Sequence, residues 1–293
     1  MSIWVDTDFG FDDLWALLVL QAGACAVDGV SLVAGNTPLD QVMRNALAAR
    51  STFGAHWPLF AGAAAPLVRP LETAQRVLGP QGMPSRGQVL PPVDEQPLPP
   101  AGPAIRAWLD TPQPRFEVLA LGPLTNLASL APNDLAKIDR IIWMGGSAGP
   151  GNHSPHAEFN ALVDPEAAAR VAASGVRLDV VDLQICRKVT FGPQDMPSNL
   201  GPLLSDLLGG YLDIALTRGR DQMAIYDPLA ALAVSNPAAI TFAPHLLSVD
   251  TSGTATYGKT TFSAASGGPV SLAVDVTPDA AALCLRAFGK ARL

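Results

Sequence analysis

The chain has 293 residues, of which 48% are hydrophobic and 15% charged, a balance typical of a globular protein with a large buried core. The net charge of −7 and the lack of any basic run argue against nucleic acid as a partner. No apolar stretch is long enough to span a membrane and no signal-peptide pattern precedes the first strand, so we expect a cytoplasmic protein without a membrane partner.

Strand and helix patterns alternate along the chain, apart from a Pro- and Gly-rich segment over 63–100 that predicts a long loop. Two or three further strands are expected between 240 and 276. Repeated strand–helix units predict an α/β fold, with an open, mostly parallel, Rossmann-like sheet and helices on both faces. We expect one domain over 1–293 with a smaller C-terminal β-containing extension. The other predicted strands cover 3–5, 27–35, 59–62, 116–121, 140–144 and 177–183, and the helices 14–20, 38–54, 101–109, 124–130, 165–174, 203–216, 227–235 and 278–290.

The three cysteines carry no metal or disulfide signature. Cys25, Cys186 and Cys284 lie far apart in apolar segments. This spacing predicts buried thiols in a reducing compartment.

Four carboxylates are crowded into the stretch Asp6-Thr7-Asp8-Phe9-Gly10-Phe11-Asp12-Asp13, between the first strand and the first helix. Asp6 and Asp8 are two residues apart and point to the same face of an extended strand. Like charges this close destabilise one another unless a proton or a cation compensates, and carboxylate oxygens suit a hard divalent ion. The alternative is that Asp12 is only a helix N-cap, Asp13 an ordinary first-turn residue, and Asp6 and Asp8 lie in solvent.

Two further polar clusters follow. The loop Gly151-Asn152-His153-Ser154-Pro155-His156-Ala157-Glu158-Phe159-Asn160 combines amides, a carboxylate and imidazoles, which suit sugar hydroxyl groups. Tyr226-Asp227-Pro228 places one more carboxylate before an apolar helix, where an Asp is most often an N-cap. An ordinary polar surface loop remains the alternative for the first cluster.

These motifs, in this order, resemble the nucleoside hydrolase family. The resemblance extends from residue 3 to about residue 230. The matching segments are the N-terminal Asp stretch, Gly35-Asn36-Thr37, Leu121-Gly122-Pro123-Leu124-Thr125-Asn126, Trp143-Met144-Gly145-Gly146, Ala157-Glu158-Phe159-Asn160, Asp164-Pro165-Glu166-Ala167-Ala168 and Tyr226-Asp227-Pro228.

The resemblance implies a Ca²⁺-dependent hydrolase that cleaves the N-glycosidic bond of ribonucleosides to free base and ribose. It implies Ca²⁺ ligands at Asp8, Asp13, Asp227 and the carbonyl of Leu121, with Asp8 also the general base that activates a metal-bound water. Asp6 would orient the ligands from behind. A homodimer or homotetramer is also implied.

The same resemblance implies a set of residues that bind the nucleoside. Met144 would pack near the sugar, and a ring of carboxylates would stabilise an oxocarbenium-like transition state. The ribose hydroxyl groups would be held by Asp12, Asn36, Asn152, Glu158 and Asn160.

The sequence departs from the family where the leaving base is protonated. Tyr226 stands where many members have a histidine, and Leu78 where a second histidine is expected. Tyr226 could stack on the base, act as a weak acid or simply pack, and we favour stacking and hence purine nucleosides. His153 and His156 could supply an acid, although solvent-exposed loop histidines are the simpler interpretation.

Two other functions compete with the hydrolase. One is a haloacid-dehalogenase-type phosphatase, but the expected acid is missing after Met144. The other is a non-catalytic Ca²⁺-dependent nucleoside or ribose binder. The sequence leaves open the preferred base, the general acid, the oligomeric state and whether 63–100 closes over the substrate.

Overall fold

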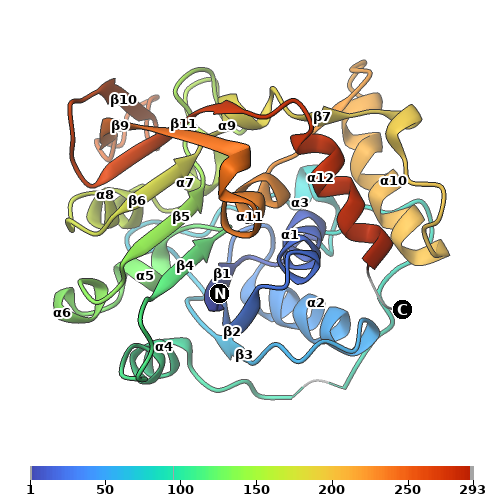
Figure 1. The fold of residues 1–293 in the computed structure, drawn as a ribbon, viewed down its shortest axis with the longest axis horizontal. Coiled ribbons are helices and arrows are strands. Elements are labelled where there is room, and N and C mark those ends of the chain that lie inside the picture. Colours follow the sequence, from blue (N-terminus) through green and yellow to red (C-terminus); the bar gives the residue numbers. More distant parts are fainter. Residues whose placement is uncertain (1, 95, 291–293) are drawn as a thin grey trace.

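The computed structural model describes residues 2–94 and 96–290, and its main feature is one nine-stranded sheet. The strands of this sheet are β1 (Ser2–Thr7), β2 (Ala26–Leu32), β3 (Leu59–Ala61), β4 (Glu117–Ala120), β5 (Arg140–Met144), β6 (Leu178–Val181), β9 (Ile240–Val249), β10 (Thr260–Ala264) and β11 (Val270–Val276). Their order across the sheet is β10-β9-β11-β6-β5-β4-β1-β2-β3 (Figure 1). The neighbouring strands from β3 to β11 are parallel, and β9 pairs antiparallel with both β11 and β10, so the predicted mostly parallel sheet is confirmed.

Helices cover both faces of the sheet because side chains alternate along each strand. On β1, Ile3 and Val5 face one apolar cluster and Trp4 faces the other. The first cluster packs under α1, α2, α10, α11 and α12, and the second under α4, α5 and α8. The helices are α1 (Phe11–Ala22), α2 (Leu39–Thr52), α3 (Gln75–Leu78), α4 (Ala101–Leu109), α5 (Thr125–Ala128), α6 (Pro132–Leu135), α7 (Phe159–Val163), α8 (Pro165–Ala172), α9 (Leu183–Cys186), α10 (Pro202–Leu216), α11 (Asp227–Ser235) and α12 (Ala280–Arg286).

The C-terminal strands continue the main sheet rather than forming a separate extension. Strand β11 pairs in parallel with β6, and the β9–β10 hairpin forms the outer edge. A small second sheet, β7 (Thr190–Phe191) with β8 (Met223–Ala224), was not predicted. No helix in the described residues is long and apolar enough to cross a membrane.

Several predicted boundaries were wrong at the carboxyl ends of strands. Strand β2 ends at Leu32, and the chain then bends through Val33–Thr37 instead of remaining extended to Gly35.

Two predicted loops contain short helices. Part of the predicted loop before Asn160 is helix α7, and the loop over 63–100 contains α3. The last predicted helix is α12 followed by a 3₁₀ turn, Ala287–Lys290. Cys186 and Cys284 are buried as predicted, but Cys25 is only half-buried.

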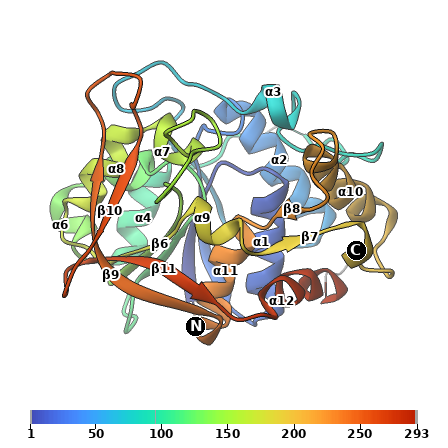
Figure 2. The ribbon, with the colours of Figure 1, turned by 90° about the horizontal axis from the view of Figure 1, so that it is seen from above.

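The order of the strands creates a crevice at the carboxyl ends of the central strands. From β1 the chain passes to β2 and β3 on one side and to β4, β5 and β6 on the other. Such a reversal leaves a crevice at the carboxyl ends of the two central strands, which here are β1 and β4. Seen from above, α3, α7 and β8 lie around these ends, although they come from distant parts of the chain (Figure 2).

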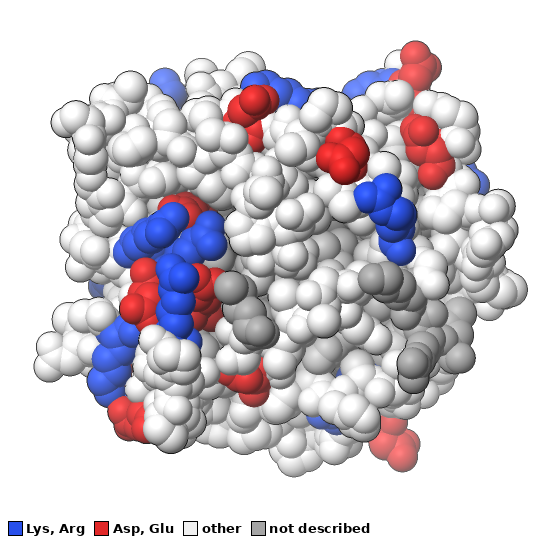
Figure 3. All heavy atoms as spheres, in the orientation of Figure 1, with Lys and Arg blue, Asp and Glu red and all other residues white. Residues whose placement is uncertain are grey.

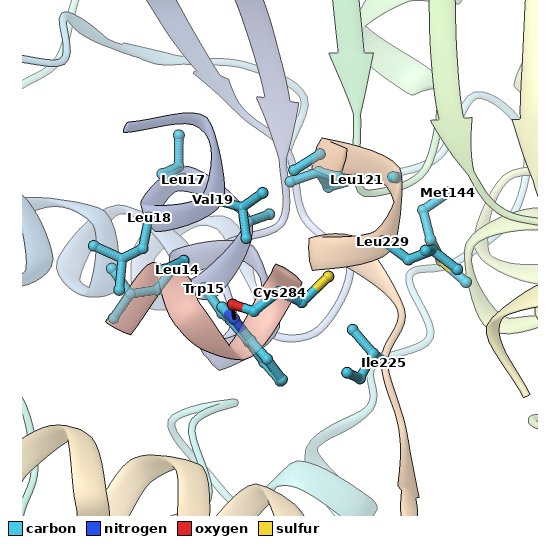
Figure 4. Packing of buried hydrophobic residues seen from close by; sticks show 14 of the residues in the cluster. Leu14, Trp15, Leu17, Leu18, Val19, Leu121, Met144, Ile225, Leu229 and Cys284 are labelled. Atoms are coloured by element: carbon cyan, nitrogen blue, oxygen red, sulfur yellow. Dashed lines mark hydrogen bonds between the residues drawn. The ribbon is translucent and has the colours of Figure 1, made fainter. Parts of the chain in front are cut away.

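Trp15 connects the first helix to the last one in the core. Its side chain is fully buried, and its indole Nε1 donates a 2.9 Å hydrogen bond to the carbonyl of Cys284 (Figure 4). We expect Trp15→Ala to lower the free energy of unfolding by about 3–5 kcal/mol, because it leaves a large cavity and an unsatisfied carbonyl. Urea unfolding would measure this.

The exposed Val68, replaced by Ala, is the control, with an expected change within about 0.5 kcal/mol. A loss no larger for Trp15→Ala than for Val68→Ala would show that Trp15 does not anchor the core.

Candidate active site

A single pocket at the carboxyl ends of the central strands gathers most of the predicted site residues. Most of them end or follow a strand, or begin a helix, at this side of the sheet, and Asn152 lies in the loop between β5 and α7. Asp6 and Asp13 do not reach the pocket surface and lie fully buried beneath it. The predicted residues that line the pocket are Asp8, Asp12, Asn36, Leu121, Met144, Asn152, Glu158, Asn160, Tyr226 and Asp227.

Asp8 is fixed by the loop that follows β2. Its carboxylate accepts hydrogen bonds from the backbone N–H of Asn36 at 2.7 Å and from the Asn36 side-chain amide at 3.1 Å. Gly35 allows this approach, because a Cβ there would lie 2.2 Å from an Asp8 oxygen. The next residue, Phe9, has a left-handed φ of 30°, which turns the chain sharply into α1.

Asp12 and Asp13 sit in the first turn of α1. Gly10 is the N-cap of this helix, so the interpretation of Asp12 as a mere N-cap was wrong. Asp13 accepts hydrogen bonds from the Thr7 hydroxyl and, at 2.7 Å, from the Gly10 N–H. Tyr211 donates its hydroxyl to Asp12 at 2.9 Å. Hydrogen bonds therefore hold both carboxylates in place.

Asp227 brings a third carboxylate to the same point from α11. Tyr226 is the N-cap of that helix, so Asp227 is in its first turn and is not the cap. One oxygen from each of Asp12, Asp13 and Asp227 lies within 4.8 Å of the others, close enough to hold a metal ion. The carboxylate of Asp8 lies outside this tight group.

Burial makes the charged forms of these carboxylates costly. It raises the pKa of Asp13 and of Glu158 to about 7 and that of Asp6 to about 6. The pKa values of Asp8 and Asp227 rise well above the usual range, through burial first and then through neighbouring negative charges. A hard cation would relieve this repulsion, and the all-oxygen donor set fits one.

The opposite wall of the pocket is the loop before α7 and the helix itself. Glu158 is the N-cap of α7 and accepts hydrogen bonds from the N–H groups of Gly146, Asn160 and Ala161 at 2.8–3.1 Å. The Asn160 amide donates to the carbonyls of Leu121 at 2.8 Å and Met144 at 3.0 Å. Asn160 thereby ties α7 to the ends of β4 and β5.

Asn152 and Asp6 occupy supporting positions. The Asn152 side chain is exposed at the pocket and accepts a 3.0 Å hydrogen bond from the N–H of Phe159. Asp6 accepts hydrogen bonds from Asn126 at 2.7 Å and from the Ser31 hydroxyl, and its second oxygen has no hydrogen-bond partner. Asp6 thus links β1 to β2 and to α5 beneath the cluster.

The third wall contains the positions where the sequence departs from the family. Tyr226 and Leu78 both line the pocket, together with Met223 and Arg220. Burial raises the pKa of Tyr226 to about 12, so its phenol holds its proton tightly. The interpretation of Tyr226 as a general acid loses support from this environment.

Sequence reasoning missed some residues of the pocket. Tyr211 falls on the apolar face of α10 and has the spacing of a core residue. Arg187 lines the pocket and donates to the carbonyls of Pro150 and Gly151, a role that no local pattern indicates. The expectation of a solvent-exposed His153 was wrong, since its side chain is 18% exposed and lines the pocket.

Comparisons with known proteins identify the family of this chain. The sequence model of the inosine-uridine preferring nucleoside hydrolases matches residues 3–282. A non-specific ribonucleoside hydrolase from Klebsiella pneumoniae subsp. pneumoniae is 35% identical over 270 residues, which cover 89% of this chain and 87% of the relative. One from Salmonella agona is 36% identical over 274 residues with the same coverage.

Solved structures show the same fold. A plant nucleoside hydrolase has a TM-score of 0.89 and 26% identity, with 98% of each chain covered. A purine-preferring ribonucleoside hydrolase from Gardnerella vaginalis has a TM-score of 0.88 over 99% of each chain, and at 23% identity it supports the fold alone. The family match over nearly the whole chain excludes the phosphatase alternative. The chain belongs to the inosine-uridine preferring nucleoside hydrolase family.

Proposed function

We propose that this chain hydrolyses the N-glycosidic bond of ribonucleosides to free base and ribose in a Ca²⁺-dependent reaction, with purine nucleosides preferred. The observation that carries the proposal is the clustering of four buried or half-buried carboxylates at and just beneath one pocket that amide side chains also line. Carboxylates and amides together satisfy sugar hydroxyl groups, which both donate and accept hydrogen bonds. The carboxylates are Asp8, Asp12, Asp13 and Asp227, and the amides are Asn36, Asn152 and Asn160.

Asp8, Asp13, Asp227 and the carbonyl of Leu121 would hold the Ca²⁺. Their oxygen donors and the electrostatic cost of leaving these carboxylates unpaired support a hard divalent cation. When bound, the cation would lower the pKa of the attacking water. Asp6 sits below this group and would orient it through β1.

Asp8 would act as the general base toward the attacking water. Its two hydrogen bonds from Asn36 fix the direction of the carboxylate, so little reorganisation is needed when it takes the proton. Negative charge around the ribose would stabilise the developing oxocarbenium ion more than the neutral substrate. The ribose itself would be held by Asp12, Asn36, Asn152, Glu158 and Asn160, with Met144 packed against it.

Tyr226 would stack on the base and favour purines. We expect Tyr226→Ala to lower kcat/KM for inosine by about 5–15-fold, as for the loss of one aromatic contact, and to change kcat/KM for uridine less. Tyr226→Phe is the matched control and should keep most of the activity, because the ring and not the hydroxyl makes the contact. Equal losses for inosine and uridine in Tyr226→Ala would count against stacking.

A hydrolysis assay tests the proposed function and separates it from nucleoside binding without turnover. Inosine, adenosine, guanosine, uridine and cytidine would each be incubated with the protein, with and without a chelator, and free base and ribose measured. We expect one ribose per base released, fastest from the purine nucleosides, and no release with the chelator. Tight binding of nucleoside without release of base would support the non-catalytic binder. Release of base at the same rate with and without the chelator would refute Ca²⁺ dependence.

The assembly and location of the protein remain predictions. We propose a homodimer or homotetramer of one-domain chains in the cytoplasm, on the strength of the family resemblance. Size-exclusion chromatography with light scattering would measure the assembly, and a monomeric mass would contradict it.

A further inference from the structure

His153 joins two loops that come from distant parts of the chain. Its Nε2 atom lies 2.5 Å from a carboxylate oxygen of Glu72, 81 residues earlier in the long Pro- and Gly-rich loop. Its ring lies 5.3 Å from the ring of Phe159, between the centroids, at an interplanar angle of 53°. The imidazole is thus restrained on two sides where it lines the pocket.

No other histidine of this chain lines that pocket. All four histidines fall within the described residues. His156 is exposed in the same loop, and His245 lies on β9 with Nδ1 2.9 Å from the carbonyl of Ala243. His56 lies in a separate hollow beside α2. His153 is therefore the one imidazole in the pocket that Tyr226 and Leu78 also line.

We propose that His153 is the general acid that protonates the departing base, and that Glu72 is its positioning residue. The inference rests on the proposed hydrolase function. A phenol whose pKa is about 12 is a poor acid at neutral pH, whereas imidazole ordinarily titrates near pH 6.5. His153 would thus supply the acid that Tyr226 and Leu78 do not provide, from the loop before α7 on another side of the same pocket.

The contact with Glu72 decides which nitrogen transfers the proton. With Nε2 donating to the carboxylate, Nδ1 is the nitrogen that carries the exchangeable proton. When the bond from C1′ to the base breaks, its electron pair stays on the base, and a base nitrogen takes the proton from Nδ1. The water oxygen bonds to C1′ and its proton goes to Asp8. Solvent then removes a proton from Asp8 and returns one to His153, which closes the cycle.

The charged groups around His153 come from three segments. Glu72 faces it from the long loop, and Arg187 binds the carbonyls of Pro150 and Gly151 just before it. Glu158 follows in the same loop, with its carboxylate occupied by N–H groups of the α7 start and of Gly146. Because a general acid must be protonated to act, kcat/KM for inosine should fall on the alkaline side of the pH profile.

Two substrates with different leaving groups test the assignment in the full-length, Ca²⁺-loaded protein. Inosine needs a proton on its base, whereas the nitrophenyl group of p-nitrophenyl riboside leaves as a stable anion. His153→Gln should lower kcat for inosine by about 10²–10⁴-fold and remove the alkaline limb of the pH profile, yet change p-nitrophenyl riboside turnover little. Glu72→Gln should show a smaller loss with the same substrate dependence. His156→Gln, three residues away and exposed, is the matched control and should behave as wild type.

Equal losses on both substrates in His153→Gln would overturn the proposal and leave His153 a purely structural role. An unchanged inosine rate or an unchanged pH profile in this variant would also overturn it. Retained turnover of p-nitrophenyl riboside would show that a variant has kept its fold. The Glu72 side chain is 56% exposed, so Glu72→Gln tests the pair without risk to the core. If wild type cleaves neither substrate, the proposed function fails, whatever the variants do.

Discussion

Asp8→Ala is expected to abolish turnover of every ribonucleoside and to weaken Ca²⁺ binding. The substitution removes the proposed base, worth about 10²–10⁴-fold on its own, together with one oxygen ligand. It also leaves the N–H of Asn36 and its amide without their acceptor. Release of base from inosine and calorimetric titration with Ca²⁺ would measure the two losses separately.

A matched control distinguishes these losses from a general charge effect. Asp40 is exposed on α2 and pairs with Arg44 at 2.9 Å, so Asp40→Ala removes the same group far from the pocket. It should change neither turnover nor Ca²⁺ affinity. Near-normal turnover in Asp8→Ala would refute its assignment as base.

Removal of the metal is the second large effect. A chelator should abolish turnover, and added Ca²⁺ should restore it, because the ion would neutralise buried carboxylates that repel one another. Ca²⁺ at about 100 times its Kd would stabilise the fold by about 2.7 kcal/mol through mass action. Mg²⁺ demands stricter octahedral geometry and should restore less activity.

The same carboxylates predict how stability depends on pH in the chelated protein. The folded-state pKa values of Asp6 and Asp13, about 6 and 7, lie above the value of 3.8 expected when unfolded. The folded protein therefore binds more protons in this range, and its stability falls as pH rises from about 4 through 7. The Tm without metal should be higher at pH 5 than at pH 8.

Added Ca²⁺ should reverse this trend. Protons compete with the cation at pH 5, so the gain in Tm on adding Ca²⁺ should be larger at pH 8. An equal gain at both pH values would mean that the metal does not bind to these carboxylates. Calorimetric scans with and without chelator at the two pH values would decide the matter.

Much of the fold was predictable because its signals are local. The five-residue run Arg140–Met144 and the apolar helix Asp227–Ser235 have the predicted bounds, since their composition and their flanking residues agree. Helix α7 was missed because five residues are too few to show a helical period. The strand predicted to reach Gly35 ends at Leu32, since the next residues bend toward Asp8.

The candidate site was predictable where its residues are neighbours in sequence. The Asp stretch gives four carboxylates at one strand end, and the fold alone brings Asp227 to within ligand distance of Asp12 and Asp13. The pairing of His153 with Glu72 could not be foreseen, because the two loops have no regular pattern and lie 81 residues apart. The contact of Tyr211 with Asp12 likewise depends on how α10 packs on α1.

The central claim is that these carboxylates form a Ca²⁺ site in which Asp8 is both ligand and base. A crystal structure with Ca²⁺ bound, located by its anomalous scattering, tests this most directly. The account predicts one ion within 2.3–2.6 Å, as is usual for Ca²⁺, of oxygens from Asp8, Asp13, Asp227 and the Leu121 carbonyl. An ion held by Asp12, Asp13 and Asp227 without Asp8 and Leu121, or no ion at this edge of the sheet, would contradict it.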